Sequence, residues 1–160
     1  MKNASLAQLR LVVGRLFVAG LWAHVPVIAV VGLANHTSWM AGSLAAIAAA
    51  AVATIAWFSD REGSLARYAI TIAQVTMVSL LVWLGQGPLQ IEVHFFYFAS
   101  FAMLAAFCDW RLIVLAAATT ALHHLVLNFL LPLALVAAVG IWRTQRNRNI
   151  RMRRMQEKYS

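Results

Sequence analysis

Residues 11–34 read LVVGRLFVAGLWAHVPVIAVVGLA, and this apolar run decides the class of fold. A transmembrane helix needs about 20 mostly apolar residues, so the run is long enough to cross a bilayer. Arg15 and His24 are its only ionisable side chains. Its length and the lack of a small-residue cleavage site distinguish it from a signal peptide that is removed. The run therefore predicts a membrane-spanning helix.

The composition of the whole chain agrees with a membrane protein. Of 160 residues, 62% are hydrophobic and 11% are charged. Soluble domains are typically about 45–50% apolar and about 25% charged, and a fold of this size could not bury so much apolar surface. The composition excludes a soluble α/β enzyme and a long disordered tail. Because Cys108 is the only cysteine, an internal disulfide scaffold is excluded as well.

We expect an all-α integral membrane bundle of five to six spans, occupying residues 1–142. Short polar segments separate the apolar runs, which makes consecutive helices antiparallel neighbours. Tryptophans fall near the ends of these runs, where an amphipathic ring prefers the headgroup layer. The predicted spans are residues 11–34, 39–58, 68–84, 91–108 and 112–131, with a partial span at 132–142.

Residues 143–160 form a basic tail that carries seven Lys and Arg side chains. We expect this tail to be cytoplasmic and to lie near anionic headgroups, with no nucleic acid as partner. Residues 112–142 correspond to about 46 Å of helix, which exceeds one passage of ~30 Å and falls short of two. Either a partial return begins at Pro132, or the last helix projects beyond the bilayer.

Four histidines are predicted at similar membrane depth on three different helices. Counted from the cytoplasmic end of each span at 1.5 Å per residue, they lie about 17–21 Å up. Ionisable residues inside a membrane are functional candidates, and imidazole is a common metal ligand. Glu92 lies close enough in sequence to add a ligand or to accept a hydrogen bond from a ligating ring. The predicted cofactor-binding layer is formed by His24, His94, His123 and His124, with Glu92 added if the ligand is a metal ion.

Two ligands fit such a layer, namely haem b held between histidines or a copper-like ion. Gly20 lies one turn below His24 and could admit a flat ring. The alternative is that the histidines only form hydrogen bonds between helices. The sequence contains no phosphate loop, nucleophile elbow or zincin pair, and we expect no enzymatic activity.

Four segments of the chain resemble a known bacterial module. They are LWAHVP at 21–26, GPLQIEVHFFYF at 87–98, DWR at 109–111 and HH at 123–124. Together they resemble the N-terminal multi-span membrane sensor module of certain methyl-accepting chemotaxis proteins and diguanylate cyclases, over about residues 10–132. The resemblance implies these motif residues: His24, Glu92, His94, Asp109, His123 and His124.

The resemblance also implies a function and a location. A module of this kind is a sensory input in the bacterial inner (cytoplasmic) membrane, and residues 143–160 would begin its signalling helix. Such modules usually have an even number of spans with both termini inside, whereas a final helix is shortened here around Pro132. We expect membrane lipids, a second copy in a homodimer, and a cytoplasmic signalling output domain or protein as partners.

A second function stays open beside the sensor. The chain could be a small membrane redox or metal-handling protein, similar to a b-type cytochrome or a copper-binding protein, without a signalling output. A separately encoded output partner would favour the sensor. A Soret band with reversible reduction and no such partner would favour the redox protein.

The distribution of basic residues predicts that the N-terminus is cytoplasmic, because residues 35–38 and 85–90 then form outer turns without Lys or Arg. In a Cys108→Ser background, Ser38→Cys should react with a membrane-impermeant maleimide added to intact cells. Ser64→Cys should react only after the cells are opened. The reverse pattern would show the opposite orientation.

Overall fold

The computed structural model describes the backbone of residues 2–159 and the side chains of residues 6–126, 129–130 and 132–148. Within these residues the secondary structure is entirely helical, and the expected all-α class is confirmed. The chain has two compact units, Met1–Thr120 and Ala121–Ser160. The elements are α1 (Lys2–Ala34), α2 (Trp39–Ser59), α3 (Ser64–Leu84), α4 (Pro88–His94), α5 (Phe96–Leu104), η1 (Ala105–Phe107), α6 (Trp110–Leu125), η2 (Val126–Leu130) and α7 (Leu131–Tyr159).

Among the described residues, four helices are long and apolar enough to cross a membrane. They are Leu6–Ala34, Trp39–Ser59, Ser64–Leu84 and Pro88–Phe107. The first four predicted spans therefore correspond to helices of suitable length. The third begins four residues earlier than expected, so that Arg67 lies within the first turn of α3. The predicted number of five to six spans is larger than the four membrane-capable helices found among the described residues.

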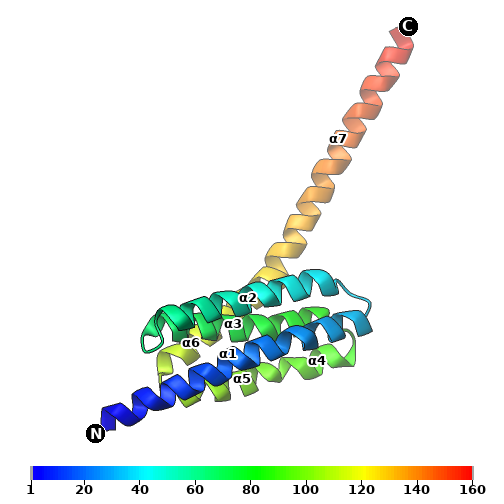
Figure 1. Cartoon of the computed structure of the whole chain (residues 1–160). Helices are drawn as coiled ribbons and strands as arrows, with labels where there is room; N and C mark the ends of the chain where they lie inside the picture. The colour runs from blue at the N-terminus through cyan, green and yellow to red at the C-terminus, as the bar shows by residue number, and fades with distance from the viewer. Residues whose placement is uncertain (1, 160) are drawn as a thin grey trace. The chain divides into compact units, whose positions relative to one another are not determined.

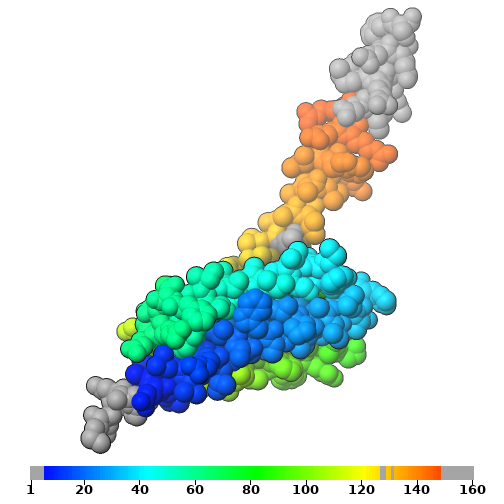
Figure 2. All heavy atoms as spheres, viewed as in Figure 1, coloured from blue at the N-terminus to red at the C-terminus, as the bar shows by residue number. Residues whose placement is uncertain are grey.

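The central helix of the first unit is α3. It packs against α1, α2, α4 and α5, and these helices lie side by side in Figure 1. In the most apolar 18-residue stretch of α3, 67% of the residues are buried. The corresponding share in the other three membrane-capable helices is 22–33%. The outer faces of α1 and α2 form much of the surface seen in Figure 2. The core of the unit therefore lies around α3, and the other helices expose apolar faces suited to lipid.

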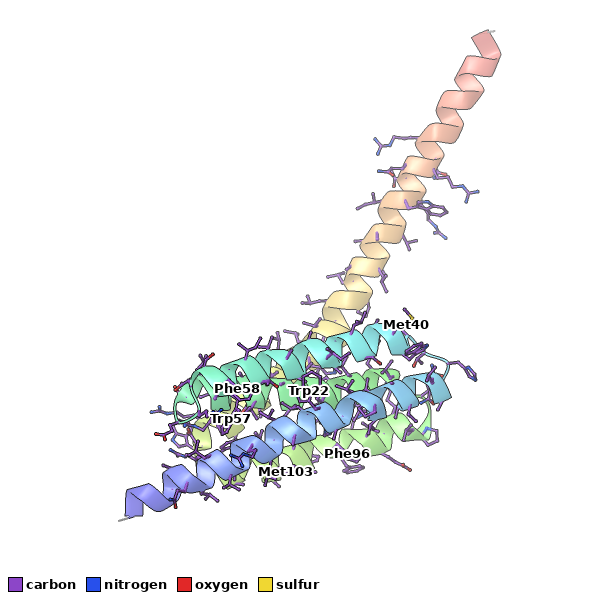
Figure 3. All side chains as sticks on the ribbon, in the orientation of Figure 1. Trp22, Met40, Trp57, Phe58, Phe96 and Met103 are labelled. Carbon is purple, nitrogen blue, oxygen red and sulfur yellow. The ribbon has the colours of Figure 1, made fainter. Side chains whose placement is uncertain are left out.

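Small residues let α2 approach its neighbours closely. Its buried face contains a glycine and a series of alanines at intervals of three or four residues, namely Gly42, Ala46, Ala50, Ala53 and Ala56. Helices in lipid associate mainly through such close packing, because lipid is as apolar as the side chains. Trp22 on α1 adds a polar contact, since its Nε1 donates to Thr54 Oγ1 of α2 at 3.0 Å. Figure 3 shows Trp22 beside α2.

The predicted span at 91–108 begins earlier and is interrupted. Gly87 adopts φ +59°, a left-handed conformation that suits glycine, and Pro88 starts α4. The helix tightens at Phe95, whose N–H donates to Glu92 O at 3.1 Å, three residues back. It ends at Phe107, and Cys108 has φ 50°. The passage is therefore α4, α5 and η1 in succession.

The predicted boundary between 112–131 and 132–142 does not match the helices. The α-helix α6 ends at Leu125, residues 126–130 form a π-helix, and α7 then continues from Leu131 to Tyr159. Pro132 closely follows the π-helix, and its missing N–H leaves one carbonyl of the preceding turn without its helical donor. No turn interrupts the described backbone from 110 to 159, so Pro132 lies within a continuous helical stretch. The basic side chains beyond 148 lie outside the described side chains.

Two glycines of α1 allow a matched test of packing. A Cβ at Gly32 would lie 2.8 Å from the Cα of Trp39, whereas a Cβ at Gly20 would meet nothing within 4 Å. Gly32→Ala should therefore destabilise the protein by about 1–3 kcal/mol. Gly20→Ala should be neutral, or stabilising by up to about 1 kcal/mol. Unfolding by SDS in mixed micelles measures both, and equal stabilities would contradict the packing of the α1–α2 turn.

Candidate functional site

A groove of about 230 Å³ runs along α1 in the first unit. Its lining comes from α1, α3 and the α5–η1 segment, and is mostly apolar. Its two hydrogen-bonding side chains are His24 and Gln74. The groove is open space beside Gly20, because a Cβ there would find no atom within 4 Å. The lining residues are Val13, Leu16, Phe17, Gly20, His24, Gln74, Met103 and Ala106.

The imidazole of His24 is held in one tautomer. Its Nδ1 lies 2.7 Å from Gly20 O. A carbonyl oxygen can only accept, so Nδ1 carries the proton and the ring lone pair lies on Nε2. A hydrogen bond from the second ring nitrogen to a backbone carbonyl is the usual way in which a ligating histidine is oriented. His24 is therefore prepared to bind a ligand through Nε2.

Two buried polar pairs hold α3 against α5 beside the groove. Gln74 Nε2 donates to Ser100 Oγ at 3.2 Å, and Ser79 Oγ lies 2.9 Å from Tyr97 OH. Hydrogen bonds between membrane helices typically contribute about 0.6 kcal/mol each. Gln74 therefore lines the groove from a fixed position, with its amide nitrogen engaged by α5.

His94 has the same local geometry on a helix that runs in the opposite direction. Its Nδ1 lies 2.7 Å from Gln90 O, the carbonyl one turn earlier. Such a bond draws each ring toward the N-terminus of its own helix. Because α1 and α4 are antiparallel, the His24 and His94 rings are drawn toward opposite ends of the bundle. Glu92 is exposed, and the acceptor for His94 Nδ1 is Gln90 O.

His123 and His124 belong to the second unit, in the last turn of α6. Their ring centroids are 5.5 Å apart, and the rings are nearly perpendicular. Among the residues that the structure describes, no three His, Cys, Asp or Glu side chains form a group able to hold a metal ion. The predicted four-histidine layer is thus divided between two units, and His24 lines the groove of the first.

Asp109, a motif residue by resemblance, has a structural role at the start of α6. Its Oδ1 accepts from the N–H of Arg111 at 3.2 Å, which caps the helix. Its Oδ2 lies 3.6 Å from Arg67 Nε in an ion pair. The sequence signal for this contact was weak, because Arg67 and Asp109 are 42 positions apart.

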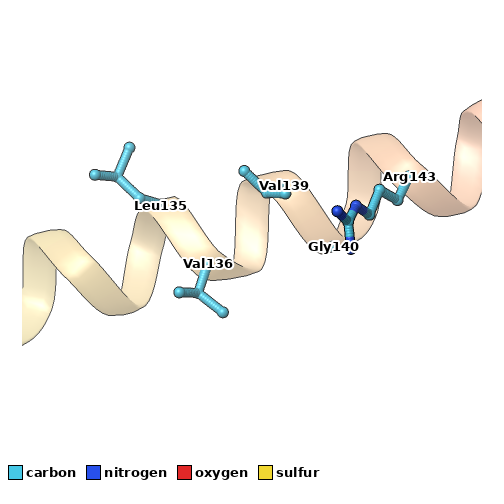
Figure 4. Close-up of a pocket in the computed structure, with 5 residues that line it drawn as sticks. All are labelled: Leu135, Val136, Val139, Gly140 and Arg143. Carbon is cyan, nitrogen blue, oxygen red and sulfur yellow. The ribbon is translucent and has the colours of Figure 1, made fainter.

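A second hollow, shown in Figure 4, lies on α7. Its lining is one face of a single helix, and a Cβ at Gly140 would meet no atom within 4 Å. Within the described residues no second element lines it, so it is an uncovered helix face. The lining residues are Leu135, Val136, Val139, Gly140 and Arg143.

Comparison with known proteins finds no protein family that matches the chain, and no curated protein or solved structure with significant similarity. The resemblance to bacterial sensor modules therefore depends on the quoted motifs alone.

The groove geometry predicts the tautomer of His24. At a pH where the ring is neutral, Nδ1 should be protonated and Nε2 should carry the lone pair. Nitrogen-15 NMR of histidine-labelled protein distinguishes the two tautomers, and a His24→Gln sample assigns the signal. A protonated Nε2 in the neutral ring would contradict the bond to Gly20 O.

Proposed function

We propose that the chain is a membrane-embedded sensory input module in which His24 and its groove bind haem b and bias a cytoplasmic output. The observation that carries this proposal is the His24 ring, oriented by Gly20 O in an apolar groove beside a membrane-capable helix. The resemblance of four segments to bacterial sensor modules supports the sensory role.

The residues of the groove suit haem better than a bare ion. Haem needs one or two axial ligands from the protein and apolar walls for its ring. His24 offers the ligand, while Leu16, Phe17 and Met103 offer apolar walls. A bare copper or zinc ion needs several ligands together, and the described residues include no such group. When bound, haem would supply redox or gas-binding chemistry.

One further predicted ligand lies in the same unit as the groove. His94 is the candidate for a second axial ligand, and copper is the alternative cofactor. His94 would have to release Gln90 O, or bind through Nε2 with its present bond intact. The latter arrangement keeps the orienting bond that ligating histidines usually have.

For topology we propose a multi-pass protein of the bacterial inner membrane with a cytoplasmic N-terminus. The four membrane-capable helices return the chain to its starting side, and residues 112–142 add further apolar helix. A cytoplasmic basic tail then requires the chain to bend within 112–142. The π-helix Val126–Leu130 is the place where the helical hydrogen-bond pattern already changes.

The proposed partners follow from this topology. Arg143, Arg146 and Arg148 are exposed on α7 and suit anionic lipid headgroups. Beyond them α7 would act as the start of a signalling helix that leads to an output domain or protein, in a homodimer.

Binding of haem is tested by absorbance. The purified protein, reconstituted with haem in detergent, should show a Soret band at about one haem per chain. His24→Ala should abolish the band, because Nε2 is the proposed axial ligand. His36→Asn is the matched control, since His36 is an exposed histidine with φ 52° and asparagine tolerates that conformation.

The outcomes separate the functions. Protein that remains colourless with haem, and free of metal after exposure to copper and zinc, would contradict a ligand site and favour interhelical hydrogen bonding. A reversible Soret shift on reduction in a protein without any output partner would favour the redox protein over the sensor.

A further inference from the structure

Arg10 holds α1 to the end of the fourth membrane-capable helix. Its Nε donates to Phe107 O at 2.9 Å, and its Nη2 donates to Cys108 O at 3.1 Å. The last carbonyls of a helix lack partners within the helix, and a guanidinium offers two donors at once. We name Arg10 with these two carbonyls the Arg10 clamp. It holds a chain reversal in which Cys108 has φ 50°, an uncommon value for a residue other than glycine.

The Arg10 clamp lies at one end of the groove. Val13, one turn after Arg10, and Ala106, directly before Phe107, both line it. Phe17 lines it too, and its ring stacks on that of Phe107 with centroids 5.2 Å apart. The groove therefore separates the same two segments that the Arg10 hydrogen bonds join. An occupant that moves α1 away from η1 would stretch these bonds.

The clamp is also continuous with the start of α6. Asp109 follows Cys108 in the chain, caps α6 and pairs with Arg67 Nε at 3.6 Å. Arg67 Nη1 in turn donates to Glu62 O and Gly63 O, each at 2.9 Å. The Arg67 and Asp109 side chains are only 12% and 13% exposed, so both are held in place. A shift of Cys108 would therefore act directly on the residue that caps α6.

We propose that the Arg10 clamp reports occupancy of the groove to α6, closed when the groove is empty and loosened when it is filled. This inference rests on the proposed function, because it takes the groove as the ligand site. A ligand can shift the clamp only if it binds the loosened arrangement more tightly. By linkage, a protein with a broken clamp should then bind the ligand more tightly by the same factor.

The natural cysteine serves as the reporter for this inference. Cys108 is exposed, and its own carbonyl accepts from Arg10. We would measure the rate at which a maleimide modifies Cys108 in the full-length protein in detergent micelles. Arg10→Gln should raise the rate, because the loss of both hydrogen bonds frees the backbone at Cys108. Arg15→Gln, at an exposed position of the same helix, is the matched control and should not change the rate.

Occupancy of the groove is then varied in two independent ways. Added haem should raise the Cys108 rate in the unmodified protein and should bind about fivefold more tightly to Arg10→Gln. Gly20→Leu should raise the rate without haem, because its side chain enters the open space of the groove. Gly140→Leu, at the other open helical glycine, is the control.

The results distinguish failure of the clamp from failure of haem binding. Equal Cys108 rates in the unmodified protein, Arg10→Gln and Gly20→Leu would overturn the inference, even if haem binds. A raised rate in Gly20→Leu without any haem binding would support the clamp and reject haem as the occupant. A rate that changes in Arg10→Gln but not with haem or Gly20→Leu would show a structural bond that is not coupled to the groove, and would also overturn the inference.

Discussion

The absence of hydrogen-bonding solvent inside a bilayer governs this structure. Polar side chains within the spans must find partners in the protein, and the nearest acceptor is the backbone carbonyl one turn earlier. Ser79 donates to Val75 O and also contacts Tyr97 OH, which joins α3 to α5. His24 likewise donates from Nδ1 to Gly20 O, the carbonyl one turn earlier. The constraint that stabilises the helices thus also fixes the tautomer of the candidate ligand.

Hydropathy and turn residues predicted where the first four membrane-capable helices lie. The α2 helix begins at Trp39 and α3 ends at Leu84, as expected from the polar segments beside them. The tightened turn at Phe95 and the π-helix Val126–Leu130 were not predicted. Both are changes in hydrogen-bond register inside apolar sequence, and such changes leave hydropathy unaltered. Apolar content therefore located the helices but not their internal breaks.

The candidate site was predicted in part, and the limit has a physical cause. Counting residues gives the depth of an α-carbon, whereas the position of an imidazole depends on its rotamer and on the direction of its helix. The rings of His24 and His94 are drawn toward opposite ends of the bundle, although their α-carbons were expected at one depth. Gly20 was recognisable one turn from His24, and its open space agrees with that expectation.

The basic residues show why charge at span ends has two meanings. In the first unit Arg10 and Arg67 donate to backbone carbonyls near helix ends. Both also belong to the excess of basic residues that the sequence predicts on the cytoplasmic side. On α7, Arg143 and Arg146 are exposed, and Arg146 lies 5.4 Å from the Trp142 ring centroid, an arrangement suited to the headgroup layer. Sequence alone gives all four the same interpretation. The hydrogen bonds of each guanidinium show whether an arginine joins two segments of the protein or is exposed to lipid headgroups. Only an arginine that joins two segments can pass a change of conformation from one segment to the other.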